Sequence, residues 1–270
     1  MKYDPIKKSL GTVFNKRPFL RKIFYRLLDL LLLRTWHIKK VIRKWKKNYK
    51  GKASILDAGS GFGQYSYYLS KQSKYWQILG VDVKQEQIDD CNRFFKQIKK
   101  IERVQFEYAD LTQFKKESAF DLILSVDVME HIEDDITVFR NFYASLKPGG
   151  MLLISTPSDQ GGSDVHGDDD HSFIDEHVRD GYNINEMEEK LKKTGFSKVE
   201  SNYSYGTPGK ISWKLSMKYP ILMLNTSKLF FIILPVYYIL AFPISIVLNY
   251  FDINKKHQSG TGLIVKAYKQ

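Results

Sequence analysis

The chain has 270 residues, a formal net charge of +12 and a single cysteine, Cys91. This length allows one large domain, or one domain with appendages. One cysteine excludes an internal disulfide and fits a reducing compartment. The positive charge is concentrated, because residues 1–50 carry sixteen Lys/Arg against two Asp/Glu, whereas residues 51–270 carry 26 against 28. The excess of basic residues therefore belongs to an N-terminal arm.

The basic arm, residues 1–50, also has the spacing of an amphipathic helix. Apolar residues recur at intervals of three and four, namely Phe19, Leu20, Ile23, Phe24, Leu27, Leu28 and Leu31, and the stripe continues through Ile38, Ile42 and Trp45. A basic amphipathic helix is typical of a protein that binds a membrane surface. The alternative is a helix that packs on the rest of the protein and leaves a solvated basic face. The arm lacks the patterns that favour nucleic acid binding or a signal peptide.

From residue 52 onward, short apolar strands alternate with amphipathic helices. Strands are predicted over 54–58, 77–82, 103–108, 120–126, 151–156, 198–205 and 262–268, and helices over 64–72, 84–100, 134–146 and 185–194. Such alternation predicts an α/β fold with a mostly parallel, doubly wound sheet. Ligands of these sheets bind outside the carboxyl ends of the strands. The site is therefore expected in the turns that follow the strands.

The turn after the first strand carries three alternate glycines, Gly59, Gly61 and Gly63, with Asp57 two positions ahead of them. Glycine lets the backbone bend sharply and approach a bulky ligand, because it has no Cβ. The turn opens onto a predicted helix N-terminus with free N–H groups. Asp82 ends the second strand, where a carboxylate can accept both hydroxyls of a ribose. Together these residues predict a site for a nucleoside cofactor.

The spacing of these glycines resembles motif I of the class I S-adenosylmethionine-dependent methyltransferases, whereas dinucleotide sites favour G-x-G-x-x-G. The resemblance continues downstream in Asp82, Ala109-Asp110-Leu111, Phe120-Asp121-Leu122-Ile123-Leu124, Asp127-Val128-Met129-Glu130-His131 and Leu146-Lys147-Pro148-Gly149-Gly150. It spans residues 52–158, and the pieces keep the order of the family. The resemblance implies a Rossmann-like sheet of seven strands, with the last strand antiparallel beside the sixth, and S-adenosylmethionine as the cofactor.

The same resemblance implies a role for each cofactor residue. The segment from Asp57 to Gly63 would hold the methionine end, Asp82 with Val83 the ribose, and Asp110 with Leu111 the adenine. Val126 would line the side of the sulfonium. The predicted cofactor-binding residues are therefore Asp57, Gly59, Gly61, Gly63, Asp82, Val83, Asp110, Leu111 and Val126.

Three histidines are candidate catalytic groups. His131 follows Glu130 in a dipeptide that family members with unrelated acceptors share, which also suits support of the cofactor pocket. His166 and His171 lie in a polar loop, residues 157–181, after the fifth strand. A histidine near its ordinary pKa can take a proton from a phenol or hydroxyl. Acceptor binding, a divalent metal and a solvated acidic loop all remain open here, but no family metal motif matches and no metal is predicted.

Residues 229–251 form an uncharged apolar run between the sixth and seventh predicted strands. The run is long enough to cross a bilayer. A single crossing would separate the seventh strand from its sheet, and Pro235 and Pro243 would break a straight helix. We therefore expect residues 208–258 to form an apolar helical insertion that dips into the membrane. The alternative is an apolar lid that is buried on its own domain or in a dimer.

The predicted organisation is a membrane-binding arm (1–50), a methyltransferase domain (51–207 and 259–270) and the insertion (208–258). The expected function is methyl transfer to a hydrophobic, lipid-like acceptor, with a quinol or phenol oxygen as the first candidate. The expected partners are the membrane lipid surface and this acceptor, with no nucleic acid, at the cytoplasmic face of the membrane. Two other classes are a catalytically silent membrane scaffold and a nicotinamide-dependent reductase. Binding of S-adenosylhomocysteine or of NAD would discriminate among them.

Overall fold

A computed structural model of the chain describes residues 17–49, 51–161, 178–227 and 229–270. Within these ranges, seven strands form one sheet in the order β3-β2-β1-β4-β5-β7-β6. The strands are β1 (Ser54–Ala58), β2 (Gln77–Asp82), β3 (Val104–Tyr108), β4 (Phe120–Val126), β5 (Leu146–Pro157), β6 (Lys198–Ser204) and β7 (Gly262–Tyr268). Only β7 runs antiparallel to its neighbours, β5 and β6. The predicted fold class is confirmed.

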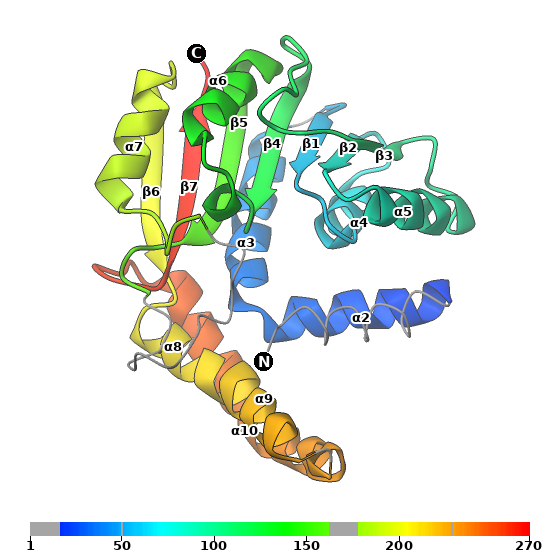
Figure 1. Cartoon of the computed structure of the whole chain (residues 1–270), viewed down its shortest axis with the longest axis vertical. Helices are drawn as coiled ribbons and strands as arrows, with labels where there is room; N and C mark the ends of the chain where they lie inside the picture. Colours follow the sequence, from blue (N-terminus) through cyan, green and yellow to red (C-terminus); the bar gives the residue numbers. More distant parts are fainter. Residues whose placement is uncertain (1–16, 50, 162–177, 228) are drawn as a thin grey trace.

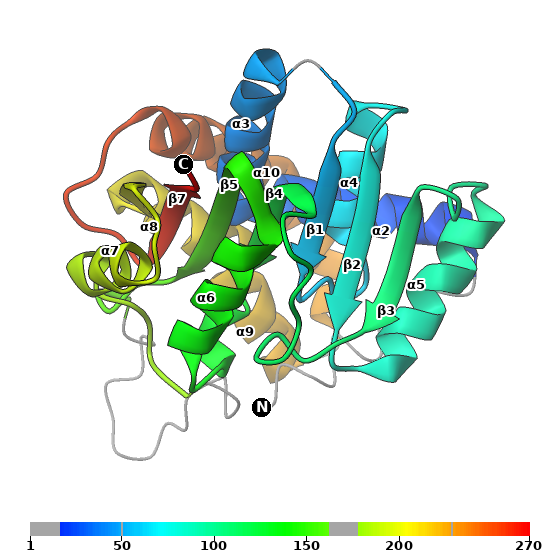
Figure 2. The same cartoon turned by 90° about the horizontal axis from the view of Figure 1, so that it is seen from above.

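Helices cover both faces of the sheet (Figures 1 and 2). One face carries α6 (Asp135–Ser145) and α7 (Ile184–Lys193), and the other carries α3 (Leu33–Asn48), α4 (Gln64–Gln72) and α5 (Gln85–Gln97). Successive residues of one strand point to opposite faces of the sheet. Leu56 packs on the face that α6 and α7 cover, and Ile55 packs on the face that α3, α4 and α5 cover. Burial on both faces explains why the parallel strands read as continuous apolar runs.

The apolar stripe of the basic arm, which the sequence predicts to bind a membrane, has a different environment in each of the two N-terminal helices. Ile38 and Ile42 of α3 are fully buried in the core against the sheet. By contrast Phe19, Leu27 and Leu30 of α2 (Pro18–Leu31) are exposed. The reason is that the second face of the sheet needs an apolar cover, and α3 provides it. Membrane binding by the arm stays a prediction, now for the outer face of α2.

Three short helical segments and one long helix lie between β6 and β7 and form a projecting hairpin (Figure 1). They are α8 (Thr207–Trp213), the π-helix η2 (Lys214–Lys218), α9 (Tyr219–Thr226) and α10 (Phe230–Asn254). We call residues 207–254 the hairpin. Its α10 packs against the other three segments. The two strand ends that flank it are register partners, Ser204 and Gly262, so the chain leaves and returns at the same point of the sheet.

The reversal of the hairpin differs from the one expected. The chain leaves the helical conformation at Ser227, whose φ of −159° and ψ of 138° are extended. In contrast, α10 continues as one helix through Pro235 and Pro243. A proline removes one helical hydrogen bond, but the remaining backbone bonds of this long helix continue past both positions. The predicted break at the prolines is therefore wrong, and the chain reverses before the apolar run.

The root of the hairpin is fixed to the body of the protein. Asp252 of α10 is fully buried, and its Oδ1 lies 2.8 Å from Nε2 of His37 on α3. Its Oδ2 accepts a hydrogen bond from the N–H of Gly209 at 3.0 Å. The ammonium of Lys40 donates to the carbonyl of Ile253. These contacts tie α10 to α3 and tie α8 to α10.

Candidate functional site

The glycine turn lies between β1 and α4, at the carboxyl edge of the sheet. Gly59, Gly61 and Gly63 have φ values of 76°, 50° and 75°, in the left-handed region that glycine adopts without strain. A Cβ at Gly59 would come within 2.2 Å of Val128 Cγ2. Among the described residues, a Cβ at Gly61 would meet only Gln87 Oε1, at 3.6 Å. The turn is thus packed on one side and open, with room for a ligand, on the other.

Two carboxylates hold this turn. Asp82 Oδ2 accepts a hydrogen bond from the N–H of Gly61 at 2.8 Å, and its Oδ1 accepts from the N–H of Lys84 at 3.0 Å. Asp57 is buried at the end of β1 and accepts from Ser66 Oγ at 2.6 Å. Burial raises the pKa of Asp57 to about 6, because a desolvated carboxylate disfavours its charge. Asp82 therefore stands beside the turn, while Asp57 ties β1 to α4.

The other predicted cofactor residues lie along the same edge of the sheet. Val83 directly follows β2 and is exposed, Leu111 is buried in the core, and Val126 ends β4 half-buried. Asp110 Oδ1 accepts hydrogen bonds from the N–H and the hydroxyl of Thr112, at 2.9 and 2.8 Å. Its carboxylate therefore caps the turn after β3. The ligand contacts implied for these residues stay predictions.

His131 stands at the surface beside a buried acid. It ends the short helix η1 (Met129–His131), and its side chain is exposed. Its neighbour Glu130 is buried and accepts a hydrogen bond from Thr156 Oγ1 at 3.0 Å. Burial, and then the charge of Asp127, raise the pKa of Glu130 to about 8. Glu130 thus supports the loop after β4, which leaves His131 as the outward group of the pair.

The other two predicted catalytic histidines, His166 and His171, lie outside the described residues. Their roles stay as predicted from the sequence. The described chain resumes at Val178, whose N–H donates to the carbonyl of Glu130 at 3.0 Å. The last part of the loop therefore contacts the turn after β4.

A second polar cluster, absent from the residues predicted for the site, lies at the carboxyl end of β4. Arg34 of α3 forms an ion pair with Asp127, and each side chain is about one-third exposed. The N–H of Arg34 donates to Tyr205 Oη at 3.0 Å. Asp127 and Tyr205 have backbone φ values of 52° and 54°, which residues other than glycine rarely adopt. Because Asp127 directly follows β4 at the edge of the sheet where ligands bind, we add Asp127 and its partner Arg34 to the candidate site.

The sequence contained a signal for only part of this cluster. Asp127 directly follows β4, as ligand-binding residues of such sheets do. Arg34 looks like its basic neighbours in the arm, and folding of α3 over the sheet brings it to Asp127. Tyr65 joins the cluster from α4, where its hydroxyl lies 3.4 Å from Thr35 Oγ1. No local pattern distinguishes Tyr65 from the other aromatic residues of that helix.

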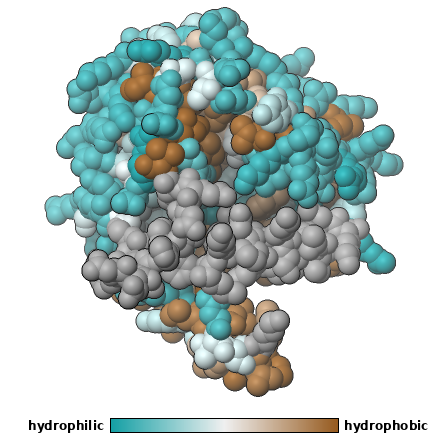
Figure 3. All heavy atoms as spheres, in the orientation of Figure 1, coloured by the Kyte–Doolittle hydropathy of each residue, from teal (hydrophilic) through white to brown (hydrophobic). Residues whose placement is uncertain are grey.

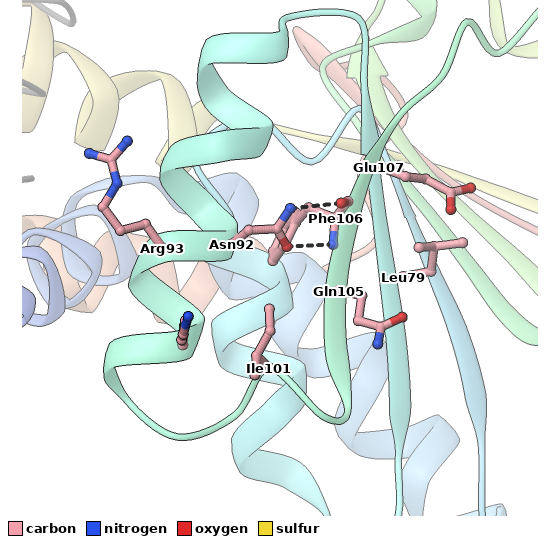
Figure 4. Close-up of a pocket in the computed structure, with 8 residues that line it drawn as sticks. Leu79, Asn92, Arg93, Ile101, Gln105, Phe106 and Glu107 are labelled. Atoms are coloured by element: carbon pink, nitrogen blue, oxygen red, sulfur yellow. Dashed lines mark hydrogen bonds between the residues drawn. The ribbon is translucent and has the colours of Figure 1, made fainter.

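An open hollow between β3 and α5 is separate from this site (Figure 4). Asn92 donates to the carbonyl of Phe106 at 2.9 Å and accepts from its N–H at 3.0 Å. The side chain of Asn92 thus occupies backbone groups at the outer edge of β3, which would otherwise be unpaired. None of the predicted cofactor residues lines this hollow. We therefore interpret it as part of the edge of the sheet.

The strand order, the antiparallel β7 and the glycine turn beside Asp82 together define a Rossmann-like protein with a site for a nucleoside cofactor. Residues 56–152 match the methyltransferase domain family. Residues 56–152 therefore carry a class I S-adenosylmethionine-dependent methyltransferase domain, as the sequence resemblance predicted, and S-adenosylmethionine is the cofactor of this domain.

Individual relatives differ in their acceptors. The chain is 34% identical over 123 residues to phosphoethanolamine N-methyltransferase 1 of Triticum aestivum, which covers 43% of this chain and 24% of that protein. It is 32% identical over 108 residues to a ubiquinone biosynthesis O-methyltransferase of Coxiella burnetii, which covers 40% of this chain and 44% of that protein. The chain thus spans less than half the length of these curated relatives.

A solved structure gives the same fold over most of the chain. It is Haemonchus contortus phosphoethanolamine N-methyltransferase 2 in complex with phosphomonomethylethanolamine and S-adenosylhomocysteine. The TM-score is 0.61 at 21% identity, over 90% of this chain and 59% of that one. At this level of identity the likeness shows the fold alone.

Proposed function

We propose that this protein transfers a methyl group from S-adenosylmethionine to a hydrophobic, lipid-like acceptor at the cytoplasmic face of a membrane. The observation that carries the proposal is the distribution of side chains on the hairpin. Small and polar residues face its interior, where Ser212, Ser216, Ser245 and Asn249 are buried. On α10 large apolar residues face outward, with Ile232 76% and Leu240 71% exposed. Figure 3 shows this hydrophobic surface projecting from a mostly hydrophilic body.

This distribution is the reverse of that in a water-soluble helical pair. Helices pack through small residues and internal hydrogen bonds where lipid surrounds them. In the hairpin, Ser212 Oγ donates to the carbonyl of Ser245 at 3.2 Å. Tyr237 and Tyr238 donate to the carbonyls of Leu215 and Ser216, at 2.7 and 2.9 Å. A lipid environment accounts for polar groups that turn inward and apolar groups that turn outward.

The dimensions of the hairpin fit a bilayer. In the described part of the chain, α10 is the one helix long and apolar enough to cross a membrane. At about 1.5 Å per residue, the arm from α8 to α9 is roughly 30 Å long, close to the thickness of a bilayer's hydrocarbon core. Both arms return to adjacent strands, so the catalytic domain stays on one side. The basic residues of the N-terminal arm, residues 1–50, favour the cytoplasmic side of the membrane for the catalytic domain.

The proposed chemistry needs alignment more than it needs a reactive side chain. Bound S-adenosylmethionine supplies an activated methyl group. Asp82 would hold the ribose, and Val126 would line the side where the acceptor arrives. Asp127 directly follows Val126 in the chain and forms an ion pair with Arg34. Both side chains are partly exposed, so the polar head of an acceptor would meet them. A quinol or phenol oxygen is the first candidate nucleophile, which the likeness to a ubiquinone biosynthesis O-methyltransferase supports.

The test supplies the protein with methyl-labelled S-adenosylmethionine and either a membrane lipid extract or phosphoethanolamine. With the lipid extract as the source of acceptor, we expect the labelled methyl group to be recovered in the organic phase after extraction. Transfer to phosphoethanolamine alone would contradict a lipid-like acceptor, although methyl transfer would stand. Binding of S-adenosylhomocysteine without any transfer would favour the silent scaffold that the sequence also allows.

A further inference from the structure

Helix α2 holds the glycine turn through two buried polar side chains. Arg21 Nη2 donates to the carbonyl oxygen of Phe62 at 2.7 Å, and the hydroxyl of Tyr25 donates to the same oxygen. Arg21 Nε in turn donates to Tyr25 Oη at 2.7 Å. The peptide after Phe62 carries the N–H of Gly63, which donates to the carbonyl of Ser60 at 2.9 Å. Contacts from α2 therefore fix the orientation of a peptide inside the cofactor turn.

Arg21 depends on this docked position. It is 2% exposed, it pairs with Asp90 Oδ2 at 2.6 Å, and it lies 4.6 Å from the centre of the Phe94 ring. Burial of a charge is strongly unfavourable unless the charge is paired and hydrogen-bonded. The guanidinium therefore favours one position of α2, against α5 and the glycine turn. The sequence pattern grouped Arg21 with the basic residues around a membrane-binding stripe, but the structure turns it toward the protein.

The outer face of α2 has the opposite character. Phe19 is 70% exposed, Leu27 and Leu30 are exposed as well, and the cation Arg26 stands among them. In Figure 1, α2 lies at the end of the molecule from which the hairpin projects. Apolar residues with interspersed cations suit a helix that lies in the interface of an anionic membrane. Polar residues toward the protein and apolar residues toward the outside repeat the arrangement of the hairpin.

We propose that Arg21 is a positioning residue that links membrane contact of α2 to the affinity for the cofactor. Lipid on the outer face of α2 favours the docked helix, and the docked helix holds the Phe62 carbonyl and with it the shape of the turn. By thermodynamic linkage, bound cofactor must strengthen membrane binding by the same factor. This inference rests on the proposed membrane function, since it requires lipid on α2.

The experiment measures the affinity for S-adenosylhomocysteine by calorimetry, with and without vesicles of phosphatidylglycerol and phosphatidylcholine in equal parts. For the unmodified full-length protein, we expect vesicles to raise the affinity by about fivefold or more. Arg21→Met should bind more weakly in solution and should lose the gain. Arg21→Lys keeps a charge opposite Asp90 but lacks the guanidinium fork, so its affinity should be intermediate. Tyr25→Phe removes one hydroxyl and replaces Arg21→Met in the test where that variant does not fold.

Arg103→Met is the matched control. Arg103 also donates to backbone carbonyls, those of Ser70 and Ser73, at a position away from α2. An equal loss of affinity in both arginine variants would overturn the proposal, because lost stability alone would explain it. An equal gain from vesicles in the unmodified protein and in Arg21→Met would overturn it too.

Sedimentation with the vesicles separates the two proposals. A protein that sediments with vesicles but shows no change in affinity contradicts the link through Arg21 and leaves the membrane function intact. A protein that does not sediment contradicts the membrane function, and the inference that rests on it falls as well.

Discussion

The N–H of Gly61 donates a hydrogen bond to Asp82 Oδ2 at 2.8 Å and so joins the glycine turn to the end of β2. The two residues are neighbours because β1 and β2 pair in parallel, which brings the ends of both strands to one edge. A carboxylate has further lone pairs, so Asp82 can hold the turn and still accept a ribose hydroxyl. The two roles can be separated by substitution.

Asp82→Ala should weaken S-adenosylhomocysteine binding by about tenfold or more, since charge-assisted hydrogen bonds contribute roughly 1.5–3 kcal/mol. Asp82→Asn keeps an oxygen for the N–H of Gly61 but loses the charge, so its affinity should fall less. Calorimetry measures both. Asp89→Ala removes an exposed carboxylate of α5 and should change nothing. Unchanged affinity in Asp82→Ala would remove Asp82 from the cofactor site.

Glu130→Gln should change how stability depends on pH. The folded protein holds a proton on Glu130 up to a pKa of about 8, against an ordinary value of 4.5. A raised carboxyl pKa means that the unmodified protein loses stability as pH rises through this window. The amide does not titrate, so the stability of the variant relative to the unmodified protein should rise by about 4 kcal/mol from about pH 5 to about pH 9. Denaturation at about pH 5 and about pH 9 measures it. A constant difference at both would mean that Glu130 is ionised in the folded protein.

Replacement of Ile239 and Leu240 by Asp should reduce retention on vesicles, because a charge in the hydrocarbon core costs roughly 2.5–3.5 kcal/mol. Turnover of a lipid acceptor should fall with it, whereas S-adenosylhomocysteine should bind as before. The single variant Leu240→Asp is compared with Tyr75→Asp, which places the same single charge on an exposed residue of the catalytic domain and serves as the control. Equal retention of both variants would exclude the hairpin as the membrane anchor.

The interior of the hairpin should not tolerate large side chains. Ser245 is buried, and its hydroxyl has no hydrogen-bond partner among the described residues. Ser245→Ala should therefore be nearly neutral. Ser245→Leu should destabilise the protein by about 1–3 kcal/mol, because it overpacks the contact with α8. Thermal unfolding in mild detergent compares the two, and equal melting temperatures would argue against close packing of the arms.

Deletion of residues 1–48 should destabilise the whole domain and weaken cofactor binding. The deletion uncovers the sheet where Ile38 and Ile42 pack, and loss of each large buried side chain typically costs about 2–5 kcal/mol. Phe19→Ser with Leu27→Ser is a gentler test of the arm, because both side chains are exposed. We expect this double variant to fold normally and to bind anionic vesicles less well. Vesicle binding equal to that of the unmodified protein would leave the hairpin as the anchor.

Most of the fold was readable from the sequence, because its signals are local. Strand and helix periods involve residues a few positions apart, and the glycine turn reads directly from Gly59, Gly61 and Gly63. Even the antiparallel β7 followed from a family resemblance carried by short motifs. Asp82 could be placed beside the turn because parallel strands end at one edge. These features depend on residues that are close in the sequence, and they do not depend on which distant segments pack beside them.

Tertiary structure decided what each apolar or basic side chain faces. The stripe of the arm has one periodicity, yet α3 buries its part against the sheet while α2 exposes its own. Arg21, Arg34 and their basic neighbours look alike in sequence, although one reaches the Phe62 carbonyl and another reaches Asp127. In the hairpin, α10 stays one helix through Pro235 and Pro243, which the local sequence did not indicate. The burial of a side chain depends on which distant segments come to lie beside it, and local spacing does not contain that information.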